Sequence, residues 1–392
     1  MAPHIATPPY PRLLRATDLL DPPFAMIDEE ALWANAADLA RRAGGVPIRL
    51  ATKSVRVRSI IKNVLTLPGF SGVMSYSLAE SVWLADHGVD DVLLAYPSVD
   101  RGAYADLVED ERRLASITVM VDSLEALDLI DAAVGADHPP IRVCLDVDSS
   151  LRVLGAHLGA HRSPVHTTRE AKRIAAAIVE RKGFDLVGLM FYDAQIAGLP
   201  DSSAAVRLVK RRSAGELRRR RGRIVKAVRS MTDLQVVNAG GTGSLDVWRD
   251  DPTITELAAG SGLFVPTLFD GYRDFEPRPA AFFALPVVRK PAPGAVTCFG
   301  GGYIASGPAG DSRVPTPVWP EGLELYPNEG AGEVQTPLRG KIARTVKVGD
   351  RVVFRHAKAG EMCERFDQVA LVDAGGQATL VPTYRGEGKN FG

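Results

Sequence analysis

One lysine of this sequence stands where it could act as a nucleophile. Lys53 ends the segment IRLATK (residues 48–53), in which apolar residues alternate with others as they do in a β-strand. At the end of a buried strand, among cations such as Arg49 and Arg56, the uncharged amine that forms imines is favoured. Most lysines are solvated surface groups, so position alone leaves a surface role equally open.

Two glycine-rich segments could bind an anion. They are NAGGTGS at residues 238–244 and AGSG at residues 259–262. Glycines let backbone N–H groups approach an anion closely, and the hydroxyls of Thr242 and Ser261 add donors. Either segment alone is weak evidence, because glycine at a turn usually only permits the turn. Together with Lys53, both segments predict a phosphate-bearing aldehyde cofactor, and pyridoxal 5′-phosphate is the obvious candidate.

Eight strand-length apolar runs, separated by helix-like segments, position these residues. The runs are 48–53, 72–77, 91–97, 116–123, 141–148, 186–193, 234–241 and 253–261. Eight successive βα units predict an α/β fold with an N-terminal (β/α)8 TIM barrel. Such barrels build their active sites at the carboxyl ends of the strands and commonly hold phosphate after strands seven and eight. Lys53 and both glycine-rich segments fall at these ends.

A region with a different sequence pattern follows the barrel. Its short apolar runs are punctuated by glycine and proline and have no helical segments between them, which predicts a C-terminal all-β domain over residues 276–392. The barrel domain is assigned residues 29–275. One further strand-like segment, Phe24 to Asp28, has no place in an eight-stranded barrel. We therefore expect the N-terminal segment, residues 1–28, to pair this strand with the C-terminal sheet.

The composition argues against several classes of function. The chain of 392 residues has 47 basic and 47 acidic residues, so it lacks the bulk charge that would hold nucleic acid or an anionic membrane. No apolar run approaches a membrane span, and the first residues lack the pattern of a signal peptide. Its three cysteines contain no CxxC and fit neither a disulfide framework nor a zinc site. We expect a cytoplasmic protein.

A basic segment at residues 207–229 is the main departure from an even charge distribution. Arg218, Arg219, Arg220 and Arg221 follow one another within it. The segment could be an anionic docking surface, tested by salt-sensitive retention of DNA. Its narrow apolar stripe favours instead a helix on the barrel exterior with a solvated basic face. The stripe consists of Ile224, Val225 and Val228.

The order of these motifs resembles the fold-type III pyridoxal-phosphate enzymes, the alanine-racemase-like barrels, and most closely their D-threonine aldolase and D-serine dehydratase branch. RLATKSVR resembles the lysine segment of that branch, and SLAESVWLADHG resembles the segment with its Ala-Glu pair, here Ala79 and Glu80. NAGGTGS and TELAAGSGLFVPTLFDGY resemble its phosphate-binding segments. The resemblance covers residues from about 20 to 372.

The resemblance implies roles for particular residues. Lys53 would be the Schiff-base lysine and the residue that removes or returns a proton. Tyr192 would contact the cofactor ring, although without the resemblance it is an ordinary aromatic at a strand end. Arg152 is the nearest candidate for a further cofactor contact, because the family's spacing places its arginine at the position of Val153. The phosphate would be surrounded by Gly241, Thr242, Gly260, Ser261 and Gly262.

The metal site of that branch is altered here. The branch holds a divalent metal with a histidine followed two residues later by cysteine or aspartate, but His356 is followed by Lys358. A lysine is cationic near neutral pH and has no lone pair for a metal. Three interpretations remain open: a metal on His356, a structural histidine, or a replacement set. That set would be Asp193, Glu361, Cys363 and Asp367. Asp193 stands where the family often has histidine, so it and His356 are further catalytic candidates.

The resemblance implies a pyridoxal-phosphate-dependent lyase that cleaves a D-β-hydroxy-α-amino acid to glycine and an aldehyde. Dehydration with deamination to a 2-oxo acid and racemisation are the alternatives. A non-catalytic pyridoxal-phosphate-binding protein is the alternative from another class, and the C-terminal domain argues against it. The expected partners are a small amino-acid substrate and a second copy of the chain. In the homodimer, the site would lie between one chain's barrel and the other's C-terminal domain.

Overall fold

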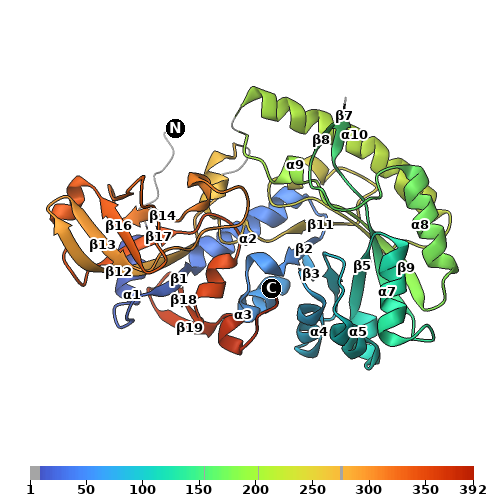
Figure 1. Cartoon of the computed structure of the whole chain (residues 1–392), viewed down its shortest axis with the longest axis horizontal. Helices are drawn as coiled ribbons and strands as arrows, with labels where there is room; N and C mark the ends of the chain where they lie inside the picture. The colour runs from blue at the N-terminus through green and yellow to red at the C-terminus, as the bar shows by residue number, and fades with distance from the viewer. Residues whose placement is uncertain (1–8, 154, 202, 274–276) are drawn as a thin grey trace.

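The computed structural model describes residues 9–153, 155–201, 203–273 and 277–392. Residues 1–8 of the predicted N-terminal segment, and the predicted boundary between residues 275 and 276, lie outside the described residues. Figure 1 shows two parts, a barrel wrapped in helices and a region built mainly of strands.

Eight parallel strands close into a barrel. Each predicted run overlaps one of these strands, so the predicted TIM barrel is confirmed. In spatial order the strands are β2 (Ile48–Ala51), β3 (Phe70–Ser75), β4 (Val92–Leu94), β5 (Ile117–Val121), β6 (Ile141–Asp146), β9 (Phe184–Phe191), β10 (Val236–Ala239) and β11 (Glu256–Ala259).

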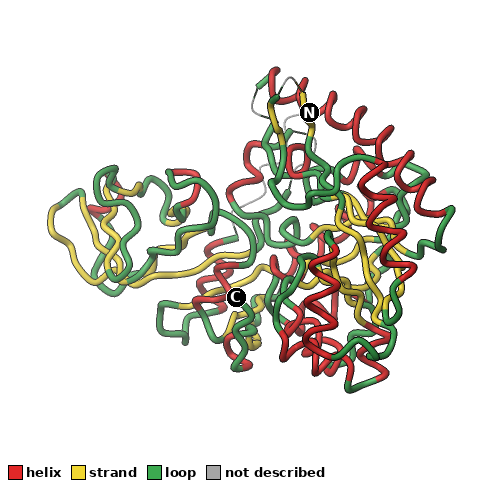
Figure 2. The backbone as a smooth tube through the Cα atoms, turned by 45° about the vertical axis from the view of Figure 1, so that its right-hand side comes forward, coloured by secondary structure: helices red, strands yellow, loops and turns green. Residues whose placement is uncertain are grey.

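Helices surround the barrel (Figure 2). They are α2 (Glu29–Ala43), α3 (Arg58–Leu65), α4 (Leu78–Asp86), α5 (Arg101–Val108), α6 (Glu111–Ser116), α7 (Leu124–Val134), α8 (Thr168–Glu180), α9 (Ala194–Ala197), α10 (Ala204–Arg229) and α11 (Leu245–Trp248). Side-chain caps fix where several of them begin. The carboxylate of Asp28, for example, accepts hydrogen bonds from the backbone of Glu30 and Ala31 at the start of α2.

The C-terminal region forms a nine-stranded sheet, which confirms the predicted mostly-β part of the fold. Strand β1 pairs antiparallel with β12 and parallel with β18, and all five of its residues are buried. The early strand therefore lies inside this sheet. The strands are β1 (Phe24–Asp28), β12 (Ala281–Ala292), β13 (Ala295–Phe299), β14 (Thr316–Trp319), β15 (Glu324–Leu325), β16 (Gln335–Arg339), β17 (Arg351–Arg355), β18 (Gln368–Val372) and β19 (Ala378–Pro382).

Short elements complete the described chain. The hairpin of β7 (Leu151–Val153) and β8 (Ala156–Leu158) follows β6, and α1 (Tyr10–Ala16) precedes β1. The 3₁₀ helices are η1 (Thr52–Ser54), η2 (Thr267–Gly271), η3 (Asp311–Arg313), η4 (Lys341–Arg344), η5 (Glu361–Arg365) and η6 (Arg385–Glu387). Among the helices that the structure describes, none is both long and apolar enough to cross a membrane.

The barrel interior contains a buried ion pair beneath the mouth. Arg49 of β2 donates to both carboxylate oxygens of Glu256 on β11, at 2.6 and 2.7 Å. It also pairs with Asp91 at 2.8 Å. Burial alone would lower the pKa of Arg49, but the two carboxylates raise it above its ordinary value. Since β2 and β11 are the first and last strands of the barrel, this ion pair crosses the junction at which the barrel closes.

The basic segment at residues 207–229 lies in α10. Its apolar stripe is buried, as predicted for a helix on the barrel: Ile224, Val225 and Val228. The prediction of a fully solvated basic face is wrong for Arg220 and Arg221, which are both buried. Arg220 donates to the carbonyl of Asp148 at 2.6 Å, and Arg221 pairs with Asp251 at 2.6 Å. Buried acceptors therefore replace water around these two guanidinium groups.

Asp251→Ala should lower the free energy of unfolding by about 3–5 kcal/mol, because Arg221 would keep a buried charge without its carboxylate. Urea denaturation of both proteins measures the difference. Asp90→Ala is the control, since Asp90 pairs with Arg112 on the surface and should change the free energy by less than about 0.5 kcal/mol. Equal losses in the two variants would contradict the buried role of Asp251.

Candidate active site

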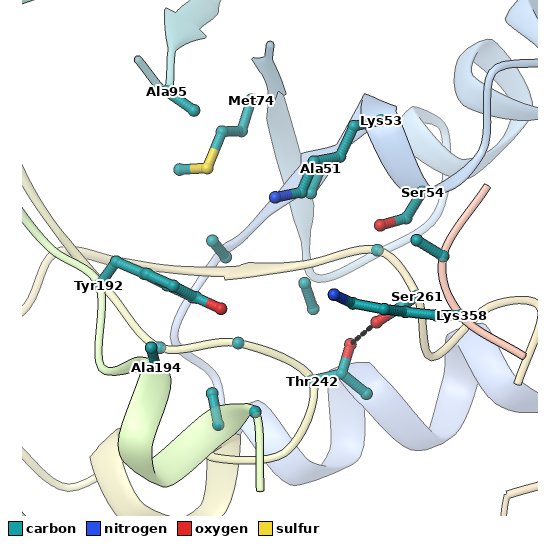
Figure 3. A pocket seen from close by; sticks show the side chains of 18 of the residues that line it. Ala51, Lys53, Ser54, Met74, Ala95, Tyr192, Ala194, Thr242, Ser261 and Lys358 are labelled. Atoms are coloured by element: carbon teal, nitrogen blue, oxygen red, sulfur yellow. Dashed lines mark hydrogen bonds between the residues drawn. The ribbon is translucent and has the colours of Figure 1, made fainter. Parts of the chain in front are cut away.

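A cavity of about 320 Å³ lies at the carboxyl ends of the barrel strands (Figure 3). A volume of this size is in the range of small-molecule sites. The C-terminal region of the same chain closes one side through Arg313, Lys358 and Ala359. Both the barrel and the C-terminal region of a single chain therefore line the cavity. That the C-terminal region of a second chain also lines it stays a prediction. Six predicted residues line the cavity: Lys53, Tyr192, Gly241, Thr242, Gly260 and Ser261.

Lys53 enters the cavity from η1, directly after β2. The hydroxyl of Thr52 donates to the carbonyl of Met74 at 3.1 Å and ties this turn to the neighbouring strand. The Nζ atom of Lys53 lies 2.6 Å from the hydroxyl oxygen of Tyr96, which follows β4. Figure 3 shows the amines of Lys53 and Lys358 both pointing into the cavity, from different walls. The predicted nucleophile is therefore held in place and faces open space.

The two glycine-rich segments form the neighbouring wall, since β11 pairs with β2 and β10 with β11. The hydroxyls of Thr242 and Ser261 lie 3.3 Å apart, which places the ends of β10 and β11 side by side (Figure 3). A Cβ atom on Gly260 would lie 2.5 Å from the carbonyl oxygen of Ala51, and one on Gly241 would lie 2.8 Å from Ala197. Close packing therefore requires glycine at both positions, a reason that the sequence pattern did not show.

Positive charge dominates the cavity lining. Lys53, Arg162, Arg313 and Lys358 all line it, and none of them forms an ion pair with a carboxylate within the described residues. Asp146 is the acidic side chain of the lining. Burial, with Asp122 nearby, raises the pKa of Asp146 to about 7, so its negative charge is weakened near neutral pH. The cavity is therefore suited to a ligand with several negative charges.

Arg162 is held across two aromatic rings of the lining. Its guanidinium lies 4.8 Å from the ring centre of Tyr192 and 5.3 Å from that of Tyr96. Such contacts orient a guanidinium without neutralising it.

Four predicted site residues lie outside the lining: Arg152, Asp193, Gly262 and His356. Arg152 points to Asp148, at 2.7 Å, so Arg162 supplies the arginine of this part of the cavity instead. Asp193 is fully buried and accepts a hydrogen bond from Trp248 at 2.8 Å. Burial raises its pKa to about 6. Gly262 donates its N–H to the Thr242 hydroxyl at 3.1 Å and supports that side chain from behind.

His356 also lies outside the lining of this cavity, in the wall of an adjoining one that shares Lys358. Burial, and then the charge of Arg355, lower the pKa of His356 to about 4, so the ring is neutral near pH 7. Within the described part of the chain, no group of three or more His, Cys, Asp or Glu could hold a metal. The replacement ligand set considered from the sequence is therefore not assembled.

The charged and hydrogen-bonding lining residues that sequence reasoning missed include Tyr96, Asp146, Arg162 and Arg313. Tyr96 and Asp146 lie near the carboxyl ends of predicted barrel runs, and that position alone could have drawn attention to them. Arg162 lies in an irregular connection and Arg313 in the short helix η3 between β13 and β14, where neither periodicity nor a motif indicates which way a side chain points.

A barrel that presents a lysine beside two glycine-rich loops, joined to a β-sheet region, has the architecture of fold-type III pyridoxal-phosphate enzymes. The chain belongs to the family defined by the alanine racemase N-terminal domain, which matches residues 27–264. Members of this family use pyridoxal phosphate. No curated protein sequence is similar enough to count as a match.

Solved structures share the fold at low sequence identity. D-threonine aldolase from Filomicrobium marinum is 20% identical, with 92% of this chain and 94% of that chain covered and a TM-score of 0.77. D-threo-3-hydroxyaspartate dehydratase from Delftia sp. HT23 is 20% identical, with 93% and 97% covered and a TM-score of 0.74. Alanine racemase from Corynebacterium glutamicum is 16% identical, with 85% and 90% covered and a TM-score of 0.60. Their reactions differ, so the likeness identifies a fold and not a reaction.

The residues present fit pyridoxal phosphate. The cavity has an amine, and next to it two hydroxyls and close-packed glycines suited to phosphate. The Oδ1 atom of Asn238, buried at the cavity, has no hydrogen-bond partner, while its Nδ2 atom donates to Glu256. The cavity therefore retains an acceptor for a polar ligand.

Ser261→Ala should weaken the affinity for pyridoxal phosphate by about 1.5–3 kcal/mol, a rise in Kd of about 10- to 150-fold, because one charge-assisted hydrogen bond is lost. Equilibrium titration of cofactor-stripped protein measures this Kd. Ser230→Ala, at the exposed end of α10, removes a hydroxyl far from the lining and serves as control. An unchanged Kd in Ser261→Ala would exclude this hydroxyl from the phosphate site.

Proposed function

We propose that this protein is a pyridoxal-phosphate-dependent lyase that cleaves a D-β-hydroxy-α-amino acid to glycine and an aldehyde. The observation that carries the proposal is the meeting of Lys53 and Lys358 in one cavity, from the barrel and from the C-terminal region (Figure 3). The first amine suits the chemistry of the α-carbon, and the second suits an oxygen on the β-carbon.

The barrel residues would bind the cofactor and handle the proton at the α-carbon. Pyridoxal phosphate, when bound, withdraws electrons from the α-carbon of an attached amino acid, which allows one bond to that carbon to break. Thr242 and Ser261, with the backbone of Gly241 and Gly260, hold the phosphate. Lys53 would hold the cofactor by its aldehyde group, and its Nζ atom would return a proton to the α-carbon.

Lys358 would act at the β-carbon. In the cleavage, the β-hydroxyl would give its proton to a water molecule, the oxygen would become a carbonyl oxygen as the Cα–Cβ bond breaks, and the electron pair of that bond would go to the α-carbon. The Lys358 ammonium stabilises the developing negative charge on that oxygen. It stands two residues after His356, where the resembling branch has a metal ligand, so one fixed charge replaces a dication.

Product analysis distinguishes this reaction from the alternatives. D-threonine should yield glycine and acetaldehyde, whereas a dehydratase would yield a 2-oxo acid and a racemase the other enantiomer. A non-catalytic carrier would yield no product. Against the carrier stands the supply of Arg313 and Lys358 by the C-terminal region, because a cofactor held in storage needs no charged groups beyond its own site.

Borohydride reduction of the purified protein should attach the cofactor to Lys53, and Lys53→Ala should lose both the attachment and at least about 10²-fold in turnover. Peptide mass mapping locates the adduct. Lys62→Ala removes an exposed lysine of α3 and should change neither readout. An adduct on another lysine would show that the proposed chemistry is wrong.

Lys358→Met should lower kcat for cleavage by about 10²- to 10³-fold, since it removes the charge at the developing oxyanion. Cofactor affinity should stay unchanged, because the phosphate is held by the barrel. Lys358→Asp should instead make activity depend on an added divalent ion, because a carboxylate would again follow His356 by two residues. Metal analysis provides the opposing outcome: a stoichiometric ion in wild type, with activity lost to a chelator and restored by that ion, contradicts the ammonium role.

A further inference from the structure

Tyr96 contacts the lysine on which the chemistry depends, although no motif singles it out. It lies two residues after the end of β4, lines the cavity, and places its hydroxyl oxygen 2.6 Å from Nζ of Lys53. The same Nζ atom lies 5.3 Å from the centre of the Tyr96 ring. A contact this short allows a proton to pass directly between nitrogen and oxygen, without a bridging water.

The surroundings of Tyr96 favour its ionised form. Burial alone would raise the pKa of Tyr96, but the charge and hydrogen bond of Lys53, and then Arg162, lower it overall, while Asp146 opposes them. Burial instead raises the pKa of Tyr192, another phenol of the lining. The titratable and charged groups that face Tyr96 are Lys53, Asp146, Arg162, Tyr192 and Lys358.

We propose that Tyr96 is the proton partner of Lys53. When the pair has lost one proton to solvent, the remaining protons form either an ammonium with a phenolate or an amine with a phenol. Passage from the first form to the second breaks one N–H bond of Lys53, forms the O–H bond of Tyr96 and leaves the lone pair on Nζ. The inference rests on the proposed role of Lys53 as the residue that binds the cofactor aldehyde.

This transfer meets a physical requirement of the site. An amine must be unprotonated to attack an aldehyde carbon, yet Nζ lies in a cavity where charge separation is costly. Both forms of the pair have zero net charge, so the proton moves without changing the charge of the cavity. Tyr96 therefore accepts the proton that leaves Nζ before the amine attacks, and it returns that proton to Nζ when Lys53 next has to act as an acid.

The first test measures capture of the cofactor. Tyr96→Phe, stripped of cofactor, should bind pyridoxal phosphate covalently at least about 10-fold more slowly at neutral pH, with a rate that recovers as the pH rises. Stopped-flow absorbance of the newly formed imine gives this rate. Tyr104→Phe is the matched control, since Tyr104 is buried in α5 outside the cavity and should capture the cofactor at the wild-type rate.

The second test observes Tyr96 itself. Ultraviolet titration of the stripped wild-type protein should show one tyrosine that ionises below the ordinary pH range of tyrosines. The step should be absent from Tyr96→Phe, kept in Tyr104→Phe, and moved to higher pH in Lys53→Met, which removes the charge beside the phenol. Because wild type and Lys53→Met suffice for this test, it stands even if Tyr96→Phe does not fold.

Two outcomes would overturn the inference alone: wild-type rates and pH dependence in Tyr96→Phe, or a wild-type titration without the early tyrosine step. In either case a borohydride adduct on Lys53 would leave the proposed function standing. An adduct on another lysine would instead remove the proposed function and the role of Tyr96 with it.

Discussion

The position of the site depends on closure of the barrel between its last and first strands. Strands β11 and β2 pair in parallel, with Ala258 opposite Arg49, and the ion pair of Arg49 with Glu256 crosses the same junction inside the barrel. Lys53 follows Arg49 by four residues, and Gly260 follows Glu256 by four. One buried, two-point contact therefore sets the distance between the Lys53 amine and the glycine-rich segment after β11, and Asn238 connects β10 to the same contact by donating a hydrogen bond to Glu256.

Regular repetition made this part of the site predictable. Strand ends recur with each βα unit, so chain order alone places Lys53, Thr242 and Ser261 at one end of the barrel. Irregular connections have no such rule. The β7–β8 hairpin turns Arg152 toward Asp148, whereas Arg162 beyond it reaches the rings of Tyr96 and Tyr192. Only tertiary contacts decide which of the two arginines enters the cavity.

Burial is the second property that sequence patterns did not show. Asp193 and Arg221 are polar residues at positions that suggested chemistry or solvent, yet both are enclosed behind the barrel wall on either side of Trp248. Asp193 accepts the indole N–H, and the guanidinium of Arg221 lies 4.2 Å from the ring centre. A polar residue that serves the packing of one tryptophan has the same local sequence signature as one that faces a ligand.

The barrel and the C-terminal region supply different kinds of side chain to the cavity. Residues from barrel strand ends are fixed by strand pairing and close glycine packing. Lys358 and Arg313 come from the C-terminal region, and the N–H groups of Thr267 and Leu268 donate to the carbonyls of His356 and Ala357, just before Lys358. A substitution of the Lys358 side chain changes the charge of the cavity lining and leaves the paired strand ends in place. Differences in reaction among proteins with this fold can therefore arise in the C-terminal region while the barrel chemistry stays constant.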